Sequence, residues 1–325
     1  MKKIWIISLI TIAAIAMLSC SKDIEINDDY KDITIVYGLL DSEDSLSYIR
    51  IEKAFLSEGS IYQDAQIADS NQYPYKLEVS VSDANGMRIV FDTTTVYNKE
   101  EGIFYKDKMK VYVADTKGKL RPNTMYTLKV RNPKTGQEQT SRCKLLDASA
   151  FLYESYYPGP RVGFTKNNHM KFKTIRDVSA YQLLIRFHYI DSLTTDHTIS
   201  YHHVDMLTPM LFSNPDAAGT PVNYPVNGNT WFAVIKAKIP VKPNVLRFAD
   251  KVEFIMYMAD TDYKTYMEIH QPNSSLVIDR PEFTNITNGY GLFAARTRYA
   301  TEHKLNGKTV VALQAIPELN FVRRD

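Results

Sequence analysis

The fold of the first half of this chain is decided by one segment, Leu120-Arg121-Pro122-Asn123-Thr124-Met125-Tyr126-Thr127-Leu128-Lys129-Val130. A leucine precedes a bend that contains proline, and a strand with the alternating pattern Tyr-x-Leu-x-Val follows the bend. An aromatic ring at this place is expected to be buried, and the hydroxyl of Tyr126 then needs a partner on the nearby backbone. The segment therefore predicts a corner between two strands that is held by a buried tyrosine.

Short strands flank this corner on both sides, from residue 32 to residue 146. Residues 77–82 alternate between apolar and polar types, and residues 83–86 end in Asn-Gly, which accepts positive φ at little cost in a hairpin turn. About seven strands with such turns predict a β-sandwich. The Tyr126 corner resembles the corner between strands E and F of fibronectin type III and immunoglobulin-like domains. This resemblance implies an Ig-like sandwich over residues 32–146.

The second half, residues 147–325, is predicted to be a second β-rich domain with short helices. Asp260 and Asp262 carry side-chain oxygens that suit the start of a helix at 263–270, and Pro272 ends that helix. Residues 209–228 form a long excursion rich in Pro, Asn and Gly. The predicted fold class is therefore mainly β. Strands are expected at 170–174, 180–190, 197–206, 230–239, 252–258, 276–278, 291–298 and 309–315.

The N-terminus has the layout of a bacterial lipoprotein signal. A basic start and an apolar stretch lead to Ala16-Met17-Leu18-Ser19-Cys20, which resembles a lipobox, although Met17 and Leu18 depart from its usual residues. This predicts a signal peptide over residues 1–19 and lipid attachment at Cys20. The alternative is an ordinary secretory leader with a cysteine there by chance.

Residues 20–31 are predicted to be a flexible tether. An aspartate directly after the cysteine would resemble an inner-membrane retention signal. This chain has Ser21 at that position, so the outer membrane is the expected location. The run Lys22-Asp23-Ile24-Glu25 resembles the acidic tether that sends Bacteroidetes lipoproteins to the cell surface. A solvated spacer is the alternative, since acidic polar runs are usually of that kind.

The charge balance argues against nucleic acid as a partner. Removal of Lys2 and Lys3 with the leader leaves 37 basic residues against 37 acidic ones, whereas nucleic-acid binding needs concentrated positive charge. With Cys20 bound to lipid, Cys143 stands alone, so a disulfide within the monomer is excluded. Cys143 alternates in phase with Leu145, which favours a buried structural thiol over a nucleophile.

Two clusters invite a catalytic or metal-binding interpretation, and neither develops into a site. Histidines 188, 197, 202 and 203 gather near Asp205, but the expected hairpin places His188 opposite Thr198, and at most two ligands meet where zinc needs three or four. Asp260, Asp262 and Glu268 suggest glycoside cleavage, yet the two aspartates suit helix capping better. No catalytic residue, metal or cofactor is therefore expected.

Tyrosine is abundant, with 22 residues, and its amphipathic ring suits contact with carbohydrate or protein. The candidate contact residues are Tyr62 in the long polar segment 56–70, Tyr156 and Tyr157 in the aromatic segment after the first domain, and Tyr224 in the excursion. An ordinary surface loop is the alternative for the first of these segments.

The tail Asn285-Ile286-Thr287-Asn288-Gly289-Tyr290-Gly291-Leu292-Phe293 resembles the end of Bacteroidetes lipoproteins in the domain-of-unknown-function family DUF4249. Gly289 and Gly291 permit a tight bend or bulge before a strand. The resemblance implies a surface accessory role beside a TonB-dependent transporter of the outer membrane, and no enzyme activity.

The leading hypothesis is therefore a non-enzymatic, lipid-anchored outer-membrane protein that binds a transporter barrel or an extracellular ligand. A secreted hydrolase acting on glycan or peptide is the first alternative, with its site in the second half. A fimbria-like adhesin subunit is the second alternative, and it would need an exposed sheet edge that accepts a strand.

Overall fold

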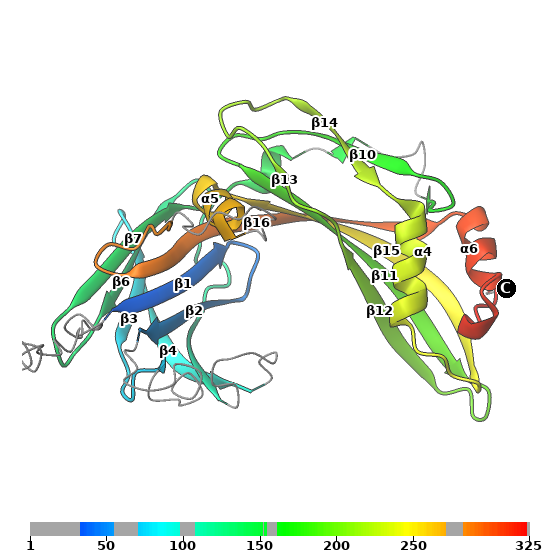
Figure 1. The fold of residues 1–325 in the computed structure, drawn as a ribbon, viewed down its shortest axis with the longest axis horizontal. Helices are drawn as coiled ribbons and strands as arrows, with labels where there is room; N and C mark the ends of the chain where they lie inside the picture. The colour runs from blue at the N-terminus through cyan, green and yellow to red at the C-terminus, as the bar shows by residue number, and fades with distance from the viewer. Residues whose placement is uncertain are drawn as a thin grey trace, which may run out of the picture.

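The computed structural model describes residues 33–54, 71–97, 108–151, 153–154 and 161–270, together with 282–323. The predicted leader, the tether and Cys20 lie outside the described residues, as do Tyr62, Tyr156 and Tyr157. Within the described part the chain is mainly β, as predicted, with a few helices (Figure 1).

The described strands between residues 34 and 144 form a two-layer sandwich. Its strands are β1 (Thr34–Asp41), β2 (Leu46–Lys53), β3 (Glu78–Asp83), β4 (Arg88–Val96), β5 (Met109–Asp115), β6 (Met125–Arg131) and β7 (Glu138–Lys144). One layer pairs β1, β2 and β5, and the other pairs β3, β6 and β7. Strand β4 belongs to both layers, since residues 88–91 pair with β3 and residues 92–96 pair with β5. Two layers of antiparallel strands agree with the predicted sandwich.

Tyr126 sits at the start of β6 with a fully buried ring. The backbone N–H of Arg121 donates to its hydroxyl at 2.8 Å, which is the geometry of a tyrosine corner. Two further buried tyrosines accept backbone N–H groups in the same way, Tyr112 from Leu77 at 2.9 Å and Tyr181 from Ile175 at 2.8 Å. Each hydroxyl satisfies a backbone donor that burial would otherwise leave unpaired.

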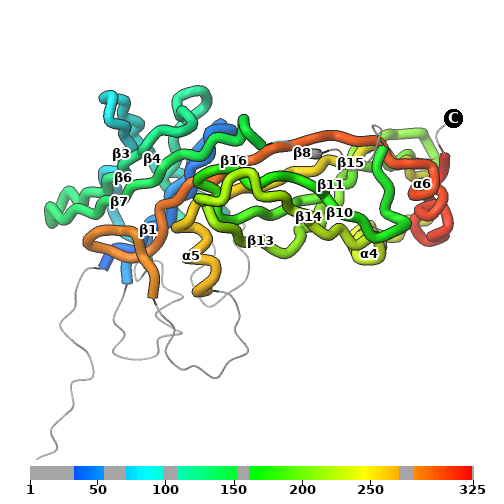
Figure 2. Tube along the Cα trace, turned by 90° about the horizontal axis from the view of Figure 1, so that it is seen from above, coloured from blue at the N-terminus to red at the C-terminus, as the bar shows by residue number. Residues whose placement is uncertain are grey.

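The strand β16 (Tyr290–Leu305) joins the two halves of the molecule. Its first residues pair in parallel with β1, and its later residues pair antiparallel with β15 (Val245–Ala259). Figure 2 shows this strand running from the sandwich toward the C-terminus. The strand pairing therefore continues across the domain boundary expected near residue 147.

Glycines permit the close approach of β16 to β1. Gly291 has φ +111°, and a Cβ atom there would lie 2.0 Å from the carbonyl oxygen of Val36. A Cβ on Gly289 would lie 2.7 Å from the carbonyl oxygen of Thr34. Neither distance is compatible with a side chain unless the backbone shifts.

The C-terminal half is built on the sheet of β11 (Ala180–Leu193), β12 (Ile199–Leu207), β15 and β16. A small sheet of β8 (Tyr153–Glu154), β10 (Asn168–Lys173) and β14 (Pro221–Val226) lies on one side of it (Figure 1). Aromatic side chains fill the layer between, including Phe172 of β10 against Tyr181 of β11, with ring centroids 5.0 Å apart. The remaining short elements are η1 (Ala148–Ala150), β9 (Arg161–Val162), β13 (Leu211–Phe212) and η2 (Pro317–Leu319).

Two predicted strands are wrong. Residues 230–239 belong mostly to helix α4 (Gly228–Lys238), and residues 309–315 mostly to helix α6 (Gly307–Gln314). An asparagine begins each helix: Asn227 accepts from the N–H of Thr230 at 3.0 Å, and Asn306 accepts from that of Thr309 at 2.9 Å. These caps satisfy free amides of the first turn and outweigh the strand propensity of the sequence.

Most other predicted elements of the second half are confirmed. The predicted strands at 170–174, 180–190, 197–206, 252–258 and 291–298 correspond to β10, β11, β12, β15 and β16, and the predicted helix at 263–270 is α5 (Thr261–His270). The excursion 209–228 contains β13 and β14, and the strand expected at 276–278 lies outside the described residues. Within the described ranges, no helix is both long enough and apolar enough to cross a membrane.

Candidate functional site

Helix α5 lies against the sheet where the sandwich meets the C-terminal half, and tyrosines gather around it. Tyr37 comes from β1, Tyr48 from β2, Tyr266 from α5 and Tyr290 from the start of β16. Tyr48 and Tyr290 are 47% and 45% exposed, and the other two are half-buried. These four side chains are called the tyrosine face below.

Strand alternation places Tyr37 and Tyr48 on this face. In β1, Val36 and Leu40 are buried in the sandwich, so Tyr37 between them points to the opposite side. In β2, Ile49 is buried in the same way, and Tyr48 is exposed. The outer surface of the sandwich therefore carries aromatic rings where it meets α5.

Two hollows open on the tyrosine face. The larger has a volume of about 490 Å³ and an apolar lining that includes Leu39, Met109 and Leu292 beside Tyr37 and Tyr48. The second has a volume of about 280 Å³ and lies between Tyr37, Tyr266 and Tyr290. Tyr37 borders both hollows, so the two form one surface.

Charged and aromatic neighbours hold Tyr37 in place. Its ring meets Tyr266 edge-on at a centroid distance of 6.1 Å, and the guanidinium of Arg50 lies 5.1 Å from its ring centre. Burial, together with the neighbouring Tyr266 hydroxyl, raises the pKa of Tyr37 to about 12. Tyr37 is therefore a neutral contact group at physiological pH rather than a base.

A third hollow of about 290 Å³ lies on the C-terminal sheet beside Tyr263 of α5. It is called the inner pocket below, and Tyr263 also borders the larger hollow of the tyrosine face. Arg296 of β16 lies across the ring of Tyr257, with the guanidinium carbon 5.0 Å from the ring centre. The inner pocket is lined by Ala180, Tyr181, Gln182, Leu184, Leu207, Met210, Tyr257, Ala259, Tyr263 and Arg296.

Asp260 fixes the N-terminus of α5 on β16. Its carboxylate accepts from the N–H of Tyr263 at 2.9 Å and from the N–H of Ala295 at 2.7 Å. Burial raises the pKa of Asp260 to about 6, and the two backbone donors oppose that shift. Since both oxygens accept backbone N–H groups, Asp260 acts as a helix cap.

The other acidic residues weighed for glycoside cleavage have separate partners. Asp262 accepts from Asn285 Nδ2 at 2.7 Å, and Glu268 pairs with Lys264 at 3.9 Å. Asn285 also binds both backbone groups of Phe293, with Nδ2 to the carbonyl at 2.8 Å and the N–H to Oδ1 at 2.9 Å. The capping interpretation therefore describes this region better than a catalytic carboxylate pair.

The predicted histidine register is wrong. His188 lies opposite His203, not Thr198, because the turn is centred two to three residues later than expected. His188 Nε2 lies 3.5 Å from Glu253, and His202 stacks on Tyr189 with centroids 5.3 Å apart. Over the described residues, no group of three or more His, Cys, Asp or Glu side chains is arranged to hold a metal ion.

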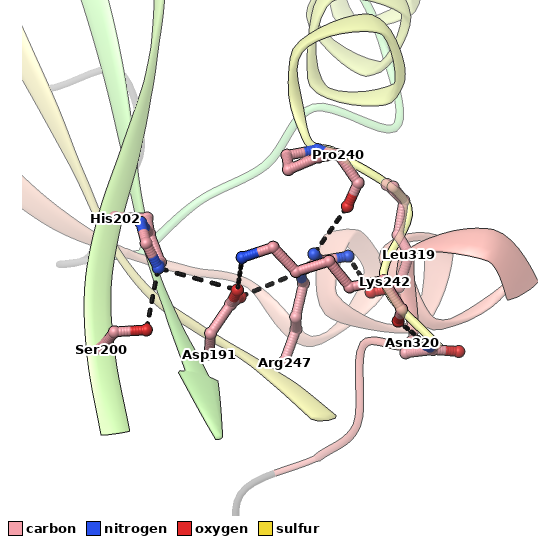
Figure 3. Close-up of polar contacts among 8 residues, drawn as sticks. All are labelled: Asp191, Ser200, His202, Pro240, Lys242, Arg247, Leu319 and Asn320. Carbon is pink, nitrogen blue, oxygen red and sulfur yellow. Dashed lines mark hydrogen bonds and ion pairs between the residues drawn. The ribbon is translucent and has the colours of Figure 1, made fainter. Parts of the chain in front are cut away.

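A buried ion pair that contacts the C-terminal segment was not anticipated from the sequence (Figure 3). Arg247 is fully buried, and its Nε donates to Asp191 at 2.9 Å across the pairing of β15 with β11. The other guanidinium nitrogens donate to the carbonyls of Leu319 and Pro240 at 3.0 and 2.7 Å. The pair therefore ties the C-terminal segment to the sheet, and it is structural. An arginine between the apolar residues Leu246 and Phe248 was the available signal.

The remaining candidate residues are buried. Tyr224 is only 5% exposed and its hydroxyl donates to Thr208, so its assignment to a contact surface is wrong: it faces the layer between the two sheets. Cys143 is buried on the same side of its strand as Leu145, and burial raises the pKa of its thiol. A protonated, inaccessible thiol is a core residue.

A scan of the chain against protein-family models and a search of curated proteins each found no match. The likeness of the tail to DUF4249 lipoproteins stays a prediction. The functional argument therefore depends on the tyrosine face and the inner pocket, which no single stretch of sequence reveals, because their residues come from elements that include β1, β2, β11, β12, β15, α5 and β16.

Proposed function

We propose that this chain is a non-enzymatic, lipid-anchored binding protein of the outer membrane, displayed at the cell surface. Cys20 carries the lipid, and the tyrosine face holds a protein partner. The observation that carries the proposal is the cluster of partly exposed tyrosines around α5 beside an apolar hollow of about 490 Å³.

The composition of the tyrosine face suits a protein interface. Tyrosine and arginine are enriched in interface cores, because they bury much apolar area and still offer a polar group. Tyrosine also loses little conformational entropy on binding, since it has only two side-chain torsions. Arg50 stacks on Tyr37 and pairs with Glu52 at 3.1 Å, so it supplies a polar rim.

A TonB-dependent transporter is the proposed partner class. The lipobox-like leader supports an outer-membrane location, and the likeness of the tail to DUF4249 lipoproteins supports an accessory role. The near-zero charge of the mature chain makes binding to nucleic acid a poor alternative.

Capture of partners from detergent-solubilised membranes tests the proposal. A chain with a C-terminal affinity tag is expected to retain a transporter barrel, identified by mass spectrometry. Tyr48→Ala combined with Tyr290→Ala should reduce that retention at least about tenfold, since each removes a large contact ring. Cys20→Ser should release the protein from the membrane fraction.

Tyr201→Ala is the matched control. Tyr201 is 77% exposed on β12, away from the tyrosine face, so its removal should leave capture unchanged. A protein that is recovered alone, or a double variant that retains the barrel as well as the natural chain does, would contradict the proposal.

A strand-joined adhesin subunit is a second candidate, because β12 ends the sheet within the described residues. Thr208 N donates to Leu183 O, and Leu193 N donates to Thr198 O, each at 3.0 Å. Strand alternation then turns the backbone groups of Ile199, Tyr201 and His203 away from β11. Loss of capture in Tyr201→Ala alone would favour this candidate over the tyrosine face.

A further inference from the structure

The inner pocket offers several hydrogen-bonding groups that have no partner among the residues that the structure describes. The amide of Gln182 is held by one bond, from Nε2 to the carbonyl of Thr208 at 3.0 Å, which leaves its Oε1 free. The hydroxyls of Tyr257 and Tyr263 and the Nη1 atom of Arg296 are free in the same sense. Polar groups that converge on one hollow are typical of a ligand site.

The charge around the inner pocket is balanced. Arg296 Nε lies 3.4 Å from Asp41 and its Nη2 lies 3.5 Å from Asp44. Arg298 Nη1 also pairs with Asp44, at 3.1 Å. Two arginines thus face two aspartates, and an anionic or cationic ligand would gain no net attraction there. The pocket suits a neutral ligand.

The floor of the inner pocket is apolar. Leu184, Ala259 and Met210 lie beside the rings of Tyr257 and Tyr263. Leu207 borders the opening and is 57% exposed. A ligand that fits this lining has an apolar face for the aromatic rings and a rim of hydroxyl groups for the amide, the phenols and the guanidinium.

We propose that the inner pocket binds one neutral sugar unit of a glycan. The pyranose ring packs its C–H face on Tyr263 and on the apolar floor. Its hydroxyls donate to Gln182 Oε1 and accept from Arg296 Nη1. The volume of about 290 Å³ limits the site to a single unit, and the open side at Leu207 lets the rest of the chain continue into solvent.

This inference does not depend on the protein partner, although Tyr263 borders both the inner pocket and the larger hollow of the tyrosine face. The sugar site lies on the C-terminal sheet, whereas Tyr48 and Tyr290 lie on the sandwich side of α5. A chain that binds glycan and no transporter, or a transporter and no glycan, would separate the two proposals.

An array of neutral and acidic glycans, probed with the lipid-free chain that begins at residue 21, tests the proposal. Binding to one or more neutral glycans is expected. The neutral oligosaccharide with the strongest signal then serves as the probe in titration calorimetry. Tyr263→Ala should weaken its affinity at least about tenfold, through loss of the stacking ring.

Two milder variants keep the test valid if Tyr263→Ala perturbs α5. Gln182→Ala and Tyr257→Phe each remove one free hydrogen-bonding group and should weaken affinity about threefold to tenfold. Tyr48→Ala is the control and should leave the affinity unchanged. Circular dichroism and thermal melting confirm that each variant is folded.

The proposal is overturned by any of three results. These are the absence of binding to any glycan, binding to acidic glycans alone, and binding of the neutral probe to Gln182→Ala and Tyr257→Phe as tightly as to the natural chain. Equal weakening by Tyr48→Ala would also contradict it, because the sugar would then lie on the tyrosine face.

Discussion

The sandwich and the C-terminal sheet bury their surfaces in different ways. In the sandwich, two layers cover each other, and β4 closes one corner by passing from one layer to the other. In the C-terminal half, the small sheet and helices α4 and α6 lie over one face of β11 and β15 (Figure 1), whereas the described residues leave most of the other face, beyond α5, open. The sandwich buries the inner faces of both its layers, whereas the C-terminal sheet leaves one face accessible.

On the open face, rows of apolar side chains and rows of charged side chains alternate along the strands. Leu184 lies opposite Leu207, and the next row pairs Arg186 with Asp205 through two hydrogen bonds of 2.8 Å. Charged rows keep such a face hydrated, while the apolar row leads into the inner pocket. The difference teaches that the two proposed binding sites lie where the closed region meets the open one, around α5.

The largest expected effect comes from breaking the seam between the two regions. Gly291→Ala should lower the free energy of unfolding by at least about 5 kcal/mol, since a Cβ only 2.0 Å from the carbonyl oxygen of Val36 forces β16 away from β1. Urea unfolding measures the loss.

Gly136→Ala is the matched control for that substitution. Gly136 also has positive φ, +76°, but nothing lies within 4 Å of its Cβ position. It should therefore cost only the backbone strain, about 1 to 2 kcal/mol. Equal losses at the two glycines would mean that the seam is not tightly packed.

The second prediction concerns the buried ion pair of the open region. Arg247→Leu should cost about 3 to 5 kcal/mol, because it leaves the carboxylate of Asp191 buried beside an apolar side chain. Lys242 at 3.2 Å and His202 at 3.6 Å compensate only in part. Thermal and urea unfolding measure the change.

Arg186→Leu provides the comparison on the open face of the same sheet. The Arg186–Asp205 pair has side chains about one-third exposed, so its removal should cost no more than about 1 kcal/mol. A loss at Arg186 as large as that at Arg247 would show that exposure does not distinguish these pairs.

The two regions also differ in how far the sequence predicts them. The sandwich was predictable because local rules agree there: alternation sets the strands, glycine turns set the hairpins, and Tyr126 marks the corner. The hydrogen bond from Arg121 to Tyr126 spans only five residues. Local chemistry therefore determines this part of the fold.

The C-terminal half was harder to predict because its sequence patterns fit both strands and helices. Apolar, β-branched runs at 230–239 and 309–315 suggest strands, yet each follows an Asn-Gly pair whose asparagine caps a helix. Asn-Gly more often indicates a hairpin turn. The apolar spacing Trp231–Ile235 was the missed sign of a helix, since residues four apart share a face.

The functional surface was not predictable from single segments. Tyr48 and Tyr290 are brought together only through β1, whose partner β16 lies more than two hundred residues away along the chain. Long-range pairing of this kind leaves no local pattern. The expectation that Tyr224 forms a contact failed for the same reason, since the sheet that buries it is assembled from distant strands.

The third prediction uses the pH dependence of Asp260, which fixes α5 at the seam. Its pKa is about 6 in the fold against an ordinary value of 3.8, so the folded state favours the protonated form. The stabilising contribution is therefore complete below about pH 4, decreases as the pH rises, and is lost above about pH 6. The change amounts to about 3 kcal/mol.

Unfolding of the natural chain and of Asp260→Asn between pH 4 and pH 7 checks this sign. The natural chain should lose stability relative to the variant as the pH rises. Asp92→Asn in the sandwich is the control, because Lys76 lowers the pKa of Asp92; its contribution is lost only below about pH 4, so the difference from the natural chain should stay constant over this range. A difference between natural chain and Asp260→Asn that is constant with pH would contradict the burial of this carboxyl.

The smallest expected effect compares one interaction in both regions. Tyr126→Phe in the sandwich and Tyr181→Phe in the C-terminal half each leave a backbone N–H, of Arg121 or Ile175, without its acceptor. Each should cost about 1 to 2 kcal/mol in urea unfolding. If the halves unfold as one unit through β16, both substitutions shift the same single transition; two transitions, each sensitive to only one tyrosine, would show that the shared strand does not couple them.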